Sequence, residues 1–209
     1  MRHHIITTAL LIAVTLMSAC KKDDDDAPPQ SGNGTGGVQV WTTQLLVIQG
    51  TDTAVLAPPQ WQVASESMFV PSGVPDFWYA LHEVVMTNTS NPTEQWRFGF
   101  IGNFLTSTGT GPTAAQTATM ISLGTLNGGR WEWNAATMSY DIIEGARVQY
   151  IDAAGVAHTT GPTATMEVQQ VQETGFSSGV QRQARLRSSG FLSGLGSRVC
   201  LYTGPVHSE

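Results

Sequence analysis

The feature that most constrains the fold is a two-residue alternation of large apolar and polar side chains, which recurs from Val38 to Glu209. It is clearest in residues 96–105, WRFGFIGNFL. A strand has this period because successive side chains point to opposite faces, whereas a helix needs apolar residues every three or four positions. We therefore expect a core strand with one face formed by Trp96, Phe98, Phe100 and Phe104 and the other by Arg97, Ile101 and Asn103.

Similar segments occur along the rest of the domain, separated by turns rich in Gly, Pro, Asn and Asp. They are residues 38–49, 61–65, 80–88, 119–126, 146–152, 156–160, 163–171, 182–188 and 197–202. About ten short strands without a convincing helix predict an all-β fold, an antiparallel β-sandwich in one domain. The alternative is a lipocalin-like or other closed β-barrel, which the Gly-x-Trp element in GGRWEWN (128–134) suggests.

The charge composition excludes several functions. Charged residues make up 12% of the chain, against about 25% in typical globular domains. From Val38 onward, seven Arg and no Lys oppose twelve Asp and Glu, so no basic field can hold a nucleic-acid backbone. The absence of Lys after Lys22 also excludes a Schiff-base lysine and a P-loop lysine.

The first twenty residues have the pattern of a secretory signal peptide. MRHH is positive, IITTALLIAVTLM is apolar but too short to span a bilayer, and Ser18 and Ala19 are the small residues that precede a cleavage site. LMSAC, residues 16–20, resembles the lipobox of bacterial lipoproteins, with Met17 where Leu is more common. This resemblance implies that residues 1–19 are removed and that Cys20 carries acyl chains, which would anchor the protein to a membrane.

The charged run directly after Cys20 is similar to the start of Bacteroidota lipoproteins, where lysine and acidic residues direct export to the outer-membrane surface. The run consists of Lys21, Lys22, Asp23, Asp24, Asp25 and Asp26. A solvated spacer is the alternative, because a block of like charges extends instead of folding. Residues 27–37, APPQSGNGTGG, follow as a flexible tether with a reach of about 20 Å. The resemblance thus implies a lipid-anchored outer-membrane protein whose domain, residues 38–209, faces the cell exterior.

Residues 125–204, with ARVQYIDAAGVAHTTG at their centre, also resemble small Bacteroidota lipoproteins of unassigned function. The likeness rests on a y-x-D-x-x-G hairpin and covers less than half of the chain. It agrees with the expected location and implies no activity.

Few residues suggest catalysis. His82 with Asp76 or Glu83, together with one of the many serines, is the only grouping that resembles a hydrolytic dyad. His82 and Glu83 are neighbours on an expected strand and so should point to opposite faces. The letters G-x-S-x-G occur once, as GFSSG at residues 175–179, and no helix is expected after them to form a nucleophile elbow. We therefore expect no enzymatic activity.

Metal and cofactor sites are not expected either. The sequence contains neither H-x-H nor H-E-x-x-H, and His82, His158 and His207 lie far apart. Once Cys20 is acylated, Cys200 has no intrachain partner for a disulfide. We expect Cys200 to be a buried, unreactive thiol.

Aromatic residues are the better candidates for binding. RWEW, residues 130–133, should place Trp131 and Trp133 on the same face of a strand. Two exposed indoles there would form a flat platform for a sugar ring or another protein, although both residues could equally be part of the core. DFWY, residues 76–79, is a second segment that could expose aromatic side chains.

Taken together, these patterns favour a surface-exposed lipoprotein that acts as a non-catalytic binding or accessory module for a glycan or an outer-membrane protein partner. Two alternatives remain open. One is a hydrolase that uses His82 and Asp76, and the other is a structural or adhesin-like component of the cell surface. Nucleic acid is not an expected partner.

Overall fold

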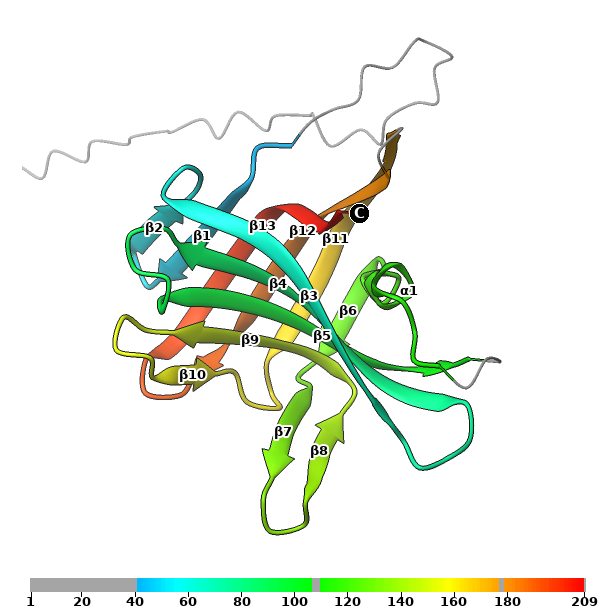
Figure 1. Cartoon of the computed structure of the whole chain (residues 1–209). Coiled ribbons are helices and arrows are strands. Elements are labelled where there is room, and N and C mark those ends of the chain that lie inside the picture. The colour runs from blue at the N-terminus through cyan, green and yellow to red at the C-terminus, as the bar shows by residue number, and fades with distance from the viewer. Residues whose placement is uncertain (1–40, 107–109, 177–178, 209) are drawn as a thin grey trace, which may run out of the picture. The chain divides into compact units, whose positions relative to one another are not determined.

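The computed structural model describes residues 41–106, 110–176 and 179–208, and most of them belong to two antiparallel sheets that face each other (Figure 1). The six-stranded sheet has the order β2-β1-β13-β12-β11-β6. Its strands are β1 (Gln44–Gln49), β2 (Asp52–Leu56), β6 (Gly124–Asn127), β11 (Thr165–Phe176), β12 (Gly179–Leu192) and β13 (Gly196–Ser208).

The second sheet has five strands in the order β10-β9-β5-β4-β3. They are β3 (Trp61–Pro71), β4 (Phe77–Asn88), β5 (Gln95–Leu105), β9 (Gly145–Ile151) and β10 (Ala157–Thr159). A separate hairpin of β7 (Arg130–Asn134) and β8 (Ser139–Ile143) projects from one end of the domain (Figure 1).

The predicted all-β sandwich is confirmed, and the alternative of a closed barrel is wrong. Within the described residues, the strand pairing ends at β2 and β6 in one sheet and at β10 and β3 in the other. An isolated bridge between Thr160 and Leu192 links the two sheets at one corner without continuing into a ladder.

The main core lies between the sheets, and β5 contributes to it as its alternation predicts. Trp96, Phe98 and Phe100 are at most 5% exposed and pack against buried residues of the six-stranded sheet, including Leu186 and Tyr202. Each fully buried aliphatic or aromatic side chain of this kind stabilises a fold by about 1.5–3 kcal/mol. This core holds the two sheets together.

Strand β4 is buried on both faces. Its side chains alternate between the core, where Val84 and Met86 lie, and the outer face, where Leu81 packs with Ile101 of β5 and Trp131 of β7. The outer face of the sheet is therefore covered at this point by the β7–β8 hairpin. This second, smaller core explains why Ile101 is 5% exposed although it points away from the first core.

One short helix and a shortened strand differ from the sequence-based expectation. Residues 119–126 were expected to form a strand, but β6 begins only at Gly124 and is preceded by helix α1 (Ala114–Ala118). Thr113 caps this helix by accepting a hydrogen bond from the Gln116 N–H, and the Gln116 side chain accepts one from the Thr113 N–H. The T-x-x-Q pattern of a capping box is thus present in the sequence, and it is the signal for α1.

The predicted lipidation site at Cys20, the charged run and the tether of residues 27–37 lie outside the described residues. In the part of the chain that is described, no helix is both long enough and apolar enough to span a bilayer.

Candidate aromatic binding site

The β7–β8 hairpin carries an aromatic cluster at the end of the domain. Trp133 and Tyr140 face each other across the hairpin register, and their ring centroids lie 5.1 Å apart at an interplanar angle of 67°. This edge-to-face geometry is a favourable arrangement for aromatic pairs. Trp133 is nevertheless 52% exposed, so much of the indole remains open to a ligand.

These two rings border a pocket of about 390 Å³ between the hairpin and the adjoining ends of β3 and β4. Tyr79 of β4 is the third aromatic residue in its wall, and it lies in the DFWY segment. The remaining lining residues are apolar or carry hydroxyl groups: Val70, Pro71, Ser72, Met138, Ser139 and Ile142. The structure thus brings together the two aromatic segments that stand more than fifty positions apart in the sequence.

The burial of Trp131 contradicts the expectation that Trp131 and Trp133 form an exposed pair of indoles. Trp131 shares a face of β7 with Trp133, as predicted, and its ring also contacts Tyr140, with 5.5 Å between centroids. It is only 5% exposed, however, because Leu81 and Ile101 of the underlying sheet pack against it. The platform therefore consists of Trp133 and Tyr140, while Trp131 fixes the base of the hairpin to the sheet.

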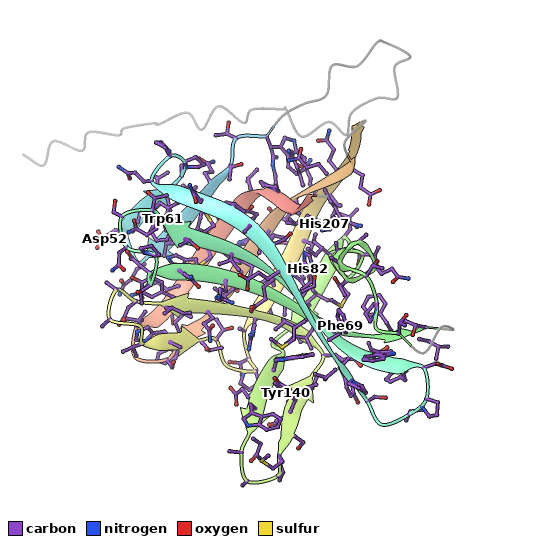
Figure 2. The ribbon with its side chains drawn as sticks, viewed as in Figure 1. Asp52, Trp61, Phe69, His82, Tyr140 and His207 are labelled. Carbon is purple, nitrogen blue, oxygen red and sulfur yellow. The ribbon has the colours of Figure 1, made fainter. Side chains whose placement is uncertain are left out.

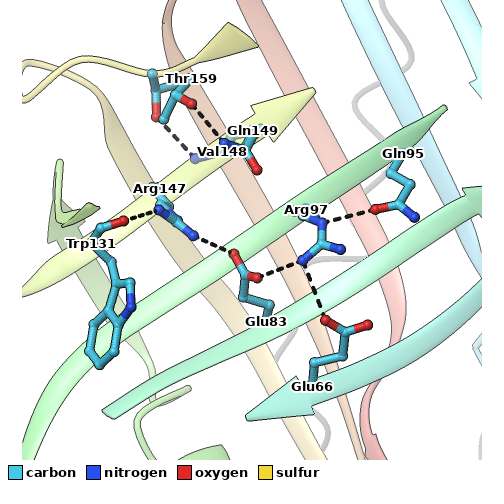
Figure 3. Close-up of polar contacts among 10 residues, drawn as sticks. Glu66, Glu83, Gln95, Arg97, Trp131, Arg147, Val148, Gln149 and Thr159 are labelled. Carbon is cyan, nitrogen blue, oxygen red and sulfur yellow. Dashed lines mark hydrogen bonds and ion pairs between the residues drawn. The ribbon is translucent and has the colours of Figure 1, made fainter. Parts of the chain in front are cut away.

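A charge cluster next to Trp131 helps to hold the hairpin (Figure 3). The Glu83 carboxylate accepts hydrogen bonds from Arg97 Nη1 and Arg147 Nη2, each at 3.0 Å. Arg147 also donates through Nη1 to the carbonyl oxygen of Trp131 at 2.8 Å. Glu66 extends the cluster at its exposed edge through Arg97 Nη1, at 3.3 Å. Charge-assisted bonds of this kind are the stronger ones in proteins, and here they connect β4, β5 and β9 to β7.

His82 lies on the opposite face of β4, as the alternation predicts, and points into the sandwich near His207 (Figure 2). It is fully buried. Its Nε2 donates to the Val206 carbonyl oxygen at 2.7 Å, because a carbonyl can only accept, and its Nδ1 then accepts from the Ser67 hydroxyl at 2.9 Å. Ser67 also contacts the Thr117 hydroxyl of α1, with 2.9 Å between the oxygens.

This network joins β3, β4, α1 and β13, and its chemistry is that of a structural anchor. A general base must reach a substrate, whereas His82 and Thr117 have no solvent-exposed surface. Burial lowers the pKa of His82 and so favours the neutral imidazole that accepts from Ser67.

The other members of the suggested hydrolytic grouping lie elsewhere. Asp76 is an exposed residue just before β4, six positions from His82, which corresponds to about 20 Å along an extended strand. Glu83 faces away from His82 and is occupied by two arginines. The structure therefore does not bring His82 and either carboxylate together as a dyad.

Cys200 is buried at 3% exposure on the inner face of β13 beside Tyr202. Burial raises the pKa of its thiol to about 12, because the thiolate would be removed from water. Among the described residues, no three His, Cys, Asp or Glu side chains are grouped closely enough to hold a metal ion.

One member of the aromatic pocket, Tyr140, was not indicated as a binding residue by the sequence, whereas Tyr79 lies in a segment that was expected to expose aromatic side chains. Tyr79 belongs to the DFWY segment, whereas Tyr140 lies in TMSYDII, where the alternation of polar and apolar residues predicts a strand but does not identify the strand with which it pairs.

Comparisons of the chain with models of protein families, with curated proteins and with solved structures found no match.

Proposed function

We propose that this protein is a lipid-anchored module of the outer-membrane surface that binds a carbohydrate in the aromatic pocket and does not cleave it. One observation carries the proposal: a half-exposed Trp133 stands edge-to-face against Tyr140 in a pocket that Tyr79 also lines. The location follows from the resemblance of LMSAC and the charged run to lipoprotein signals.

The chemistry of the pocket suits a sugar. A pyranose ring has an apolar face of C–H groups, which packs against an indole or phenol ring, and a rim of hydroxyl groups that need hydrogen-bond partners. Trp133 and Tyr140 supply aromatic faces, while the Ser72 and Ser139 side chains supply hydroxyl groups in the same wall. Small-molecule sites commonly combine a largely apolar surface with a few polar groups in this way.

The composition of the wall supports binding without hydrolysis. Glycoside hydrolysis ordinarily requires a pair of carboxyl groups on either side of the scissile bond. None of the described residues that line the pocket is Asp, Glu or His. A sugar held there would therefore meet no general acid or base.

The position of the pocket agrees with an anchored protein. Figure 1 places the β7–β8 hairpin at the end of the domain that lies away from the start of β1. The lipid anchor would connect to the domain through the residues that precede β1, so the pocket would lie at a distance from the point of attachment. A binding site there could meet soluble glycans or the glycans of another cell.

The test is a glycan array followed by isothermal titration calorimetry with the glycans that bind. Trp133→Ala should weaken binding about tenfold or more, because the removed ring would supply most of the contact with the sugar. Phe191→Ala is the matched control, since Phe191 is an exposed aromatic residue, at 60%, on the other sheet.

Three results would contradict the proposal. They are the absence of binding to any glycan on the array, an equal loss of affinity in both variants, and release of a shortened saccharide from a bound glycan. The thermal midpoint of Trp133→Ala should stay close to that of the unmodified protein, because this ring is not part of the buried core.

A further inference from the structure

The outer face of the six-stranded sheet contains arginines that have no acidic partner. Four of the seven domain arginines, at positions 97, 130, 147 and 182, form ion pairs with carboxylates. Within the described residues, Arg185, Arg187 and Arg198 form none. Arg185 and Arg187 lie on the outer face of β12, whereas Arg198 of β13 is on the same face as the inward-facing Cys200 and Tyr202. A domain with an excess of acidic residues thus has one face on which positive charge is left available.

Arg185 is held in a defined position on this face. Its Cζ lies 5.1 Å from the ring centroid of Trp41, which is a cation–π distance. Stacking uses the flat face of the guanidinium and leaves the N–H groups in its plane available to donate. The planar fork of these groups matches the two oxygens of a carboxylate.

A hollow of about 460 Å³ surrounds this guanidinium. Its polar lining includes the amide side chains of Gln44 and Gln169 and the hydroxyl group of Thr203. Leu46 and Leu201 form an apolar part of the floor, and they are direct cross-strand neighbours in the β1–β13 ladder. Hydrogen-bond donors, hydrogen-bond acceptors and apolar side chains therefore line the hollow together with the Arg185 guanidinium.

The charge next to the hollow is also positive. Arg187 follows Arg185 by two positions on the same exposed face, a separation of about 7 Å along the strand. The acidic residue opposite Arg187 in the ladder is Glu167, whose carboxylate accepts a hydrogen bond from Gln169 at 3.0 Å. Two arginines beside one carboxylate give this part of the sheet an excess of positive charge.

We propose that this hollow is a second binding site, which takes a saccharide bearing a carboxylate. Arg185 would bind the carboxylate through its N–H fork, and Arg187 would add attraction at longer range. Gln44, Gln169 and Thr203 would bind the hydroxyl groups of the sugar, and the two leucines would contact its C–H surface. This site lies on the other sheet from the aromatic pocket and does not depend on it.

The experiment uses calorimetry of the full domain with oligogalacturonate, alginate oligosaccharides, hyaluronan oligosaccharides and N-acetylneuraminic acid. At least one of these should bind, and its methyl ester, which lacks the charge, should not. Arg185→Gln should weaken binding about tenfold, because hydrogen bonds to a charged group are lost. Arg130→Gln is the matched control, since it removes the same charge from an exposed residue of the hairpin.

Binding should also survive Trp133→Ala, which separates this site from the aromatic pocket. The proposal is overturned if none of the four acidic saccharides binds, or if the methyl ester binds as well as the acid. Equal losses in Arg185→Gln and Arg130→Gln would show attraction by net charge alone and would also overturn it. Arg185-dependent binding of phosphatidylglycerol vesicles, without binding of a saccharide, would identify a lipid surface instead.

Discussion

Glu83 of β4 and Arg147 of β9 form an ion pair across the outer face of the five-stranded sheet, with 3.0 Å between Oε1 and Nη2. Their side chains are 7% and 11% exposed, and Glu83 binds Arg97 through its other oxygen. The Glu83 carboxylate thus bridges two arginines that are largely withdrawn from water, and Glu66 adds a second, exposed carboxylate on Arg97. Because Arg147 also binds the Trp131 carbonyl oxygen, this pair connects the sheet to the hairpin that carries the aromatic pocket.

We expect Glu83→Gln to lower the free energy of unfolding by about 3 kcal/mol, because it leaves the mostly buried Arg147 without a compensating charge and leaves Arg97 with only the exposed Glu66. Urea denaturation monitored by tryptophan fluorescence measures this loss. Glu66→Gln is the control: its side chain is 57% exposed and its ion pair with Arg97 should contribute less than about 1 kcal/mol. Equal and small losses in both variants would contradict the structural role of Glu83.

Stability should depend on pH through His82. Burial lowers the pKa of His82 below the usual 6.5, and His207 and Arg182 lower it further, while the Val206 carbonyl and Glu83 act in the opposite direction. The unfolded chain therefore takes up a proton near pH 6.5, whereas the folded protein does so only at lower pH. The free energy of unfolding should be highest above this pH and should fall as the pH drops below it.

His82→Gln removes this titrating group and can still donate to the Val206 carbonyl. The stability difference between the unmodified protein and this variant should shrink as the pH falls below about 6.5. Urea unfolding at a series of pH values measures both curves. Two curves that stay parallel across the whole range would show that His82 does not contribute to the pH dependence.

The thiol of Cys200 should be unreactive in the folded protein, because burial raises its pKa to about 12 and shields the sulfur. In a Cys20→Ala variant Cys200 is the sole cysteine of the chain. Iodoacetamide should label it only as fast as the domain unfolds, and urea should accelerate the labelling. Rapid labelling without denaturant, measured by mass spectrometry, would place the thiol at an accessible surface.

Cys20→Ala should release the protein from membranes. The acyl chains implied by the lipobox resemblance attach to the Cys20 sulfur, and a substitution there leaves no site for them. The variant should appear in the soluble fraction after ultracentrifugation and should not incorporate radioactive palmitate. Unchanged membrane fractionation would exclude a lipid anchor at this residue.

Replacement of residues 21–26 by neutral residues should keep the protein anchored but prevent its display on the cell surface. Protease added to intact cells should digest the domain of the unmodified protein and should spare that of the variant. A variant in which only Asp23 and Asp24 are exchanged for Glu retains the charge and serves as the control. If the neutral variant is digested as readily, the charged run acts as a spacer and not as an export signal.

The sequence predicted the strands with the clearest alternation. In β5, the aromatic side chains at positions 96, 98, 100 and 104 share one face, and β9 and β10 are two segments of alternating side chains joined by a turn that contains glycine. For these strands the local pattern was sufficient. The segment 119–126 was misassigned because a capped one-turn helix occupies the space before β6, and apolar residues there contact the core without forming a ladder. Ile121, for example, is fully buried outside any strand.

The candidate site could be predicted only in part. Alternation placed Trp131 and Trp133 on one face, but it could not tell which of the two would be covered. That depended on Leu81 and Ile101, which reach the hairpin from other strands. Tyr79 lines the pocket because the start of β4 lies next to the β7–β8 hairpin, and the local sequence does not show that these two segments are neighbours.

Local pattern by itself thus determined that the domain is built of antiparallel strands, that His82 and Glu83 face opposite sides, and that the N-terminal segment resembles a lipoprotein signal. These properties depend on neighbouring residues, because a strand exposes alternate side chains and a signal is read as a continuous segment. Only the tertiary structure decided that the sheets form an open sandwich, that Trp131 is buried while Trp133 is exposed, and that Arg185 has no acidic partner among the described residues. Burial and ion pairing depend on residues brought together from different strands, and a single sequence does not specify which strands become neighbours.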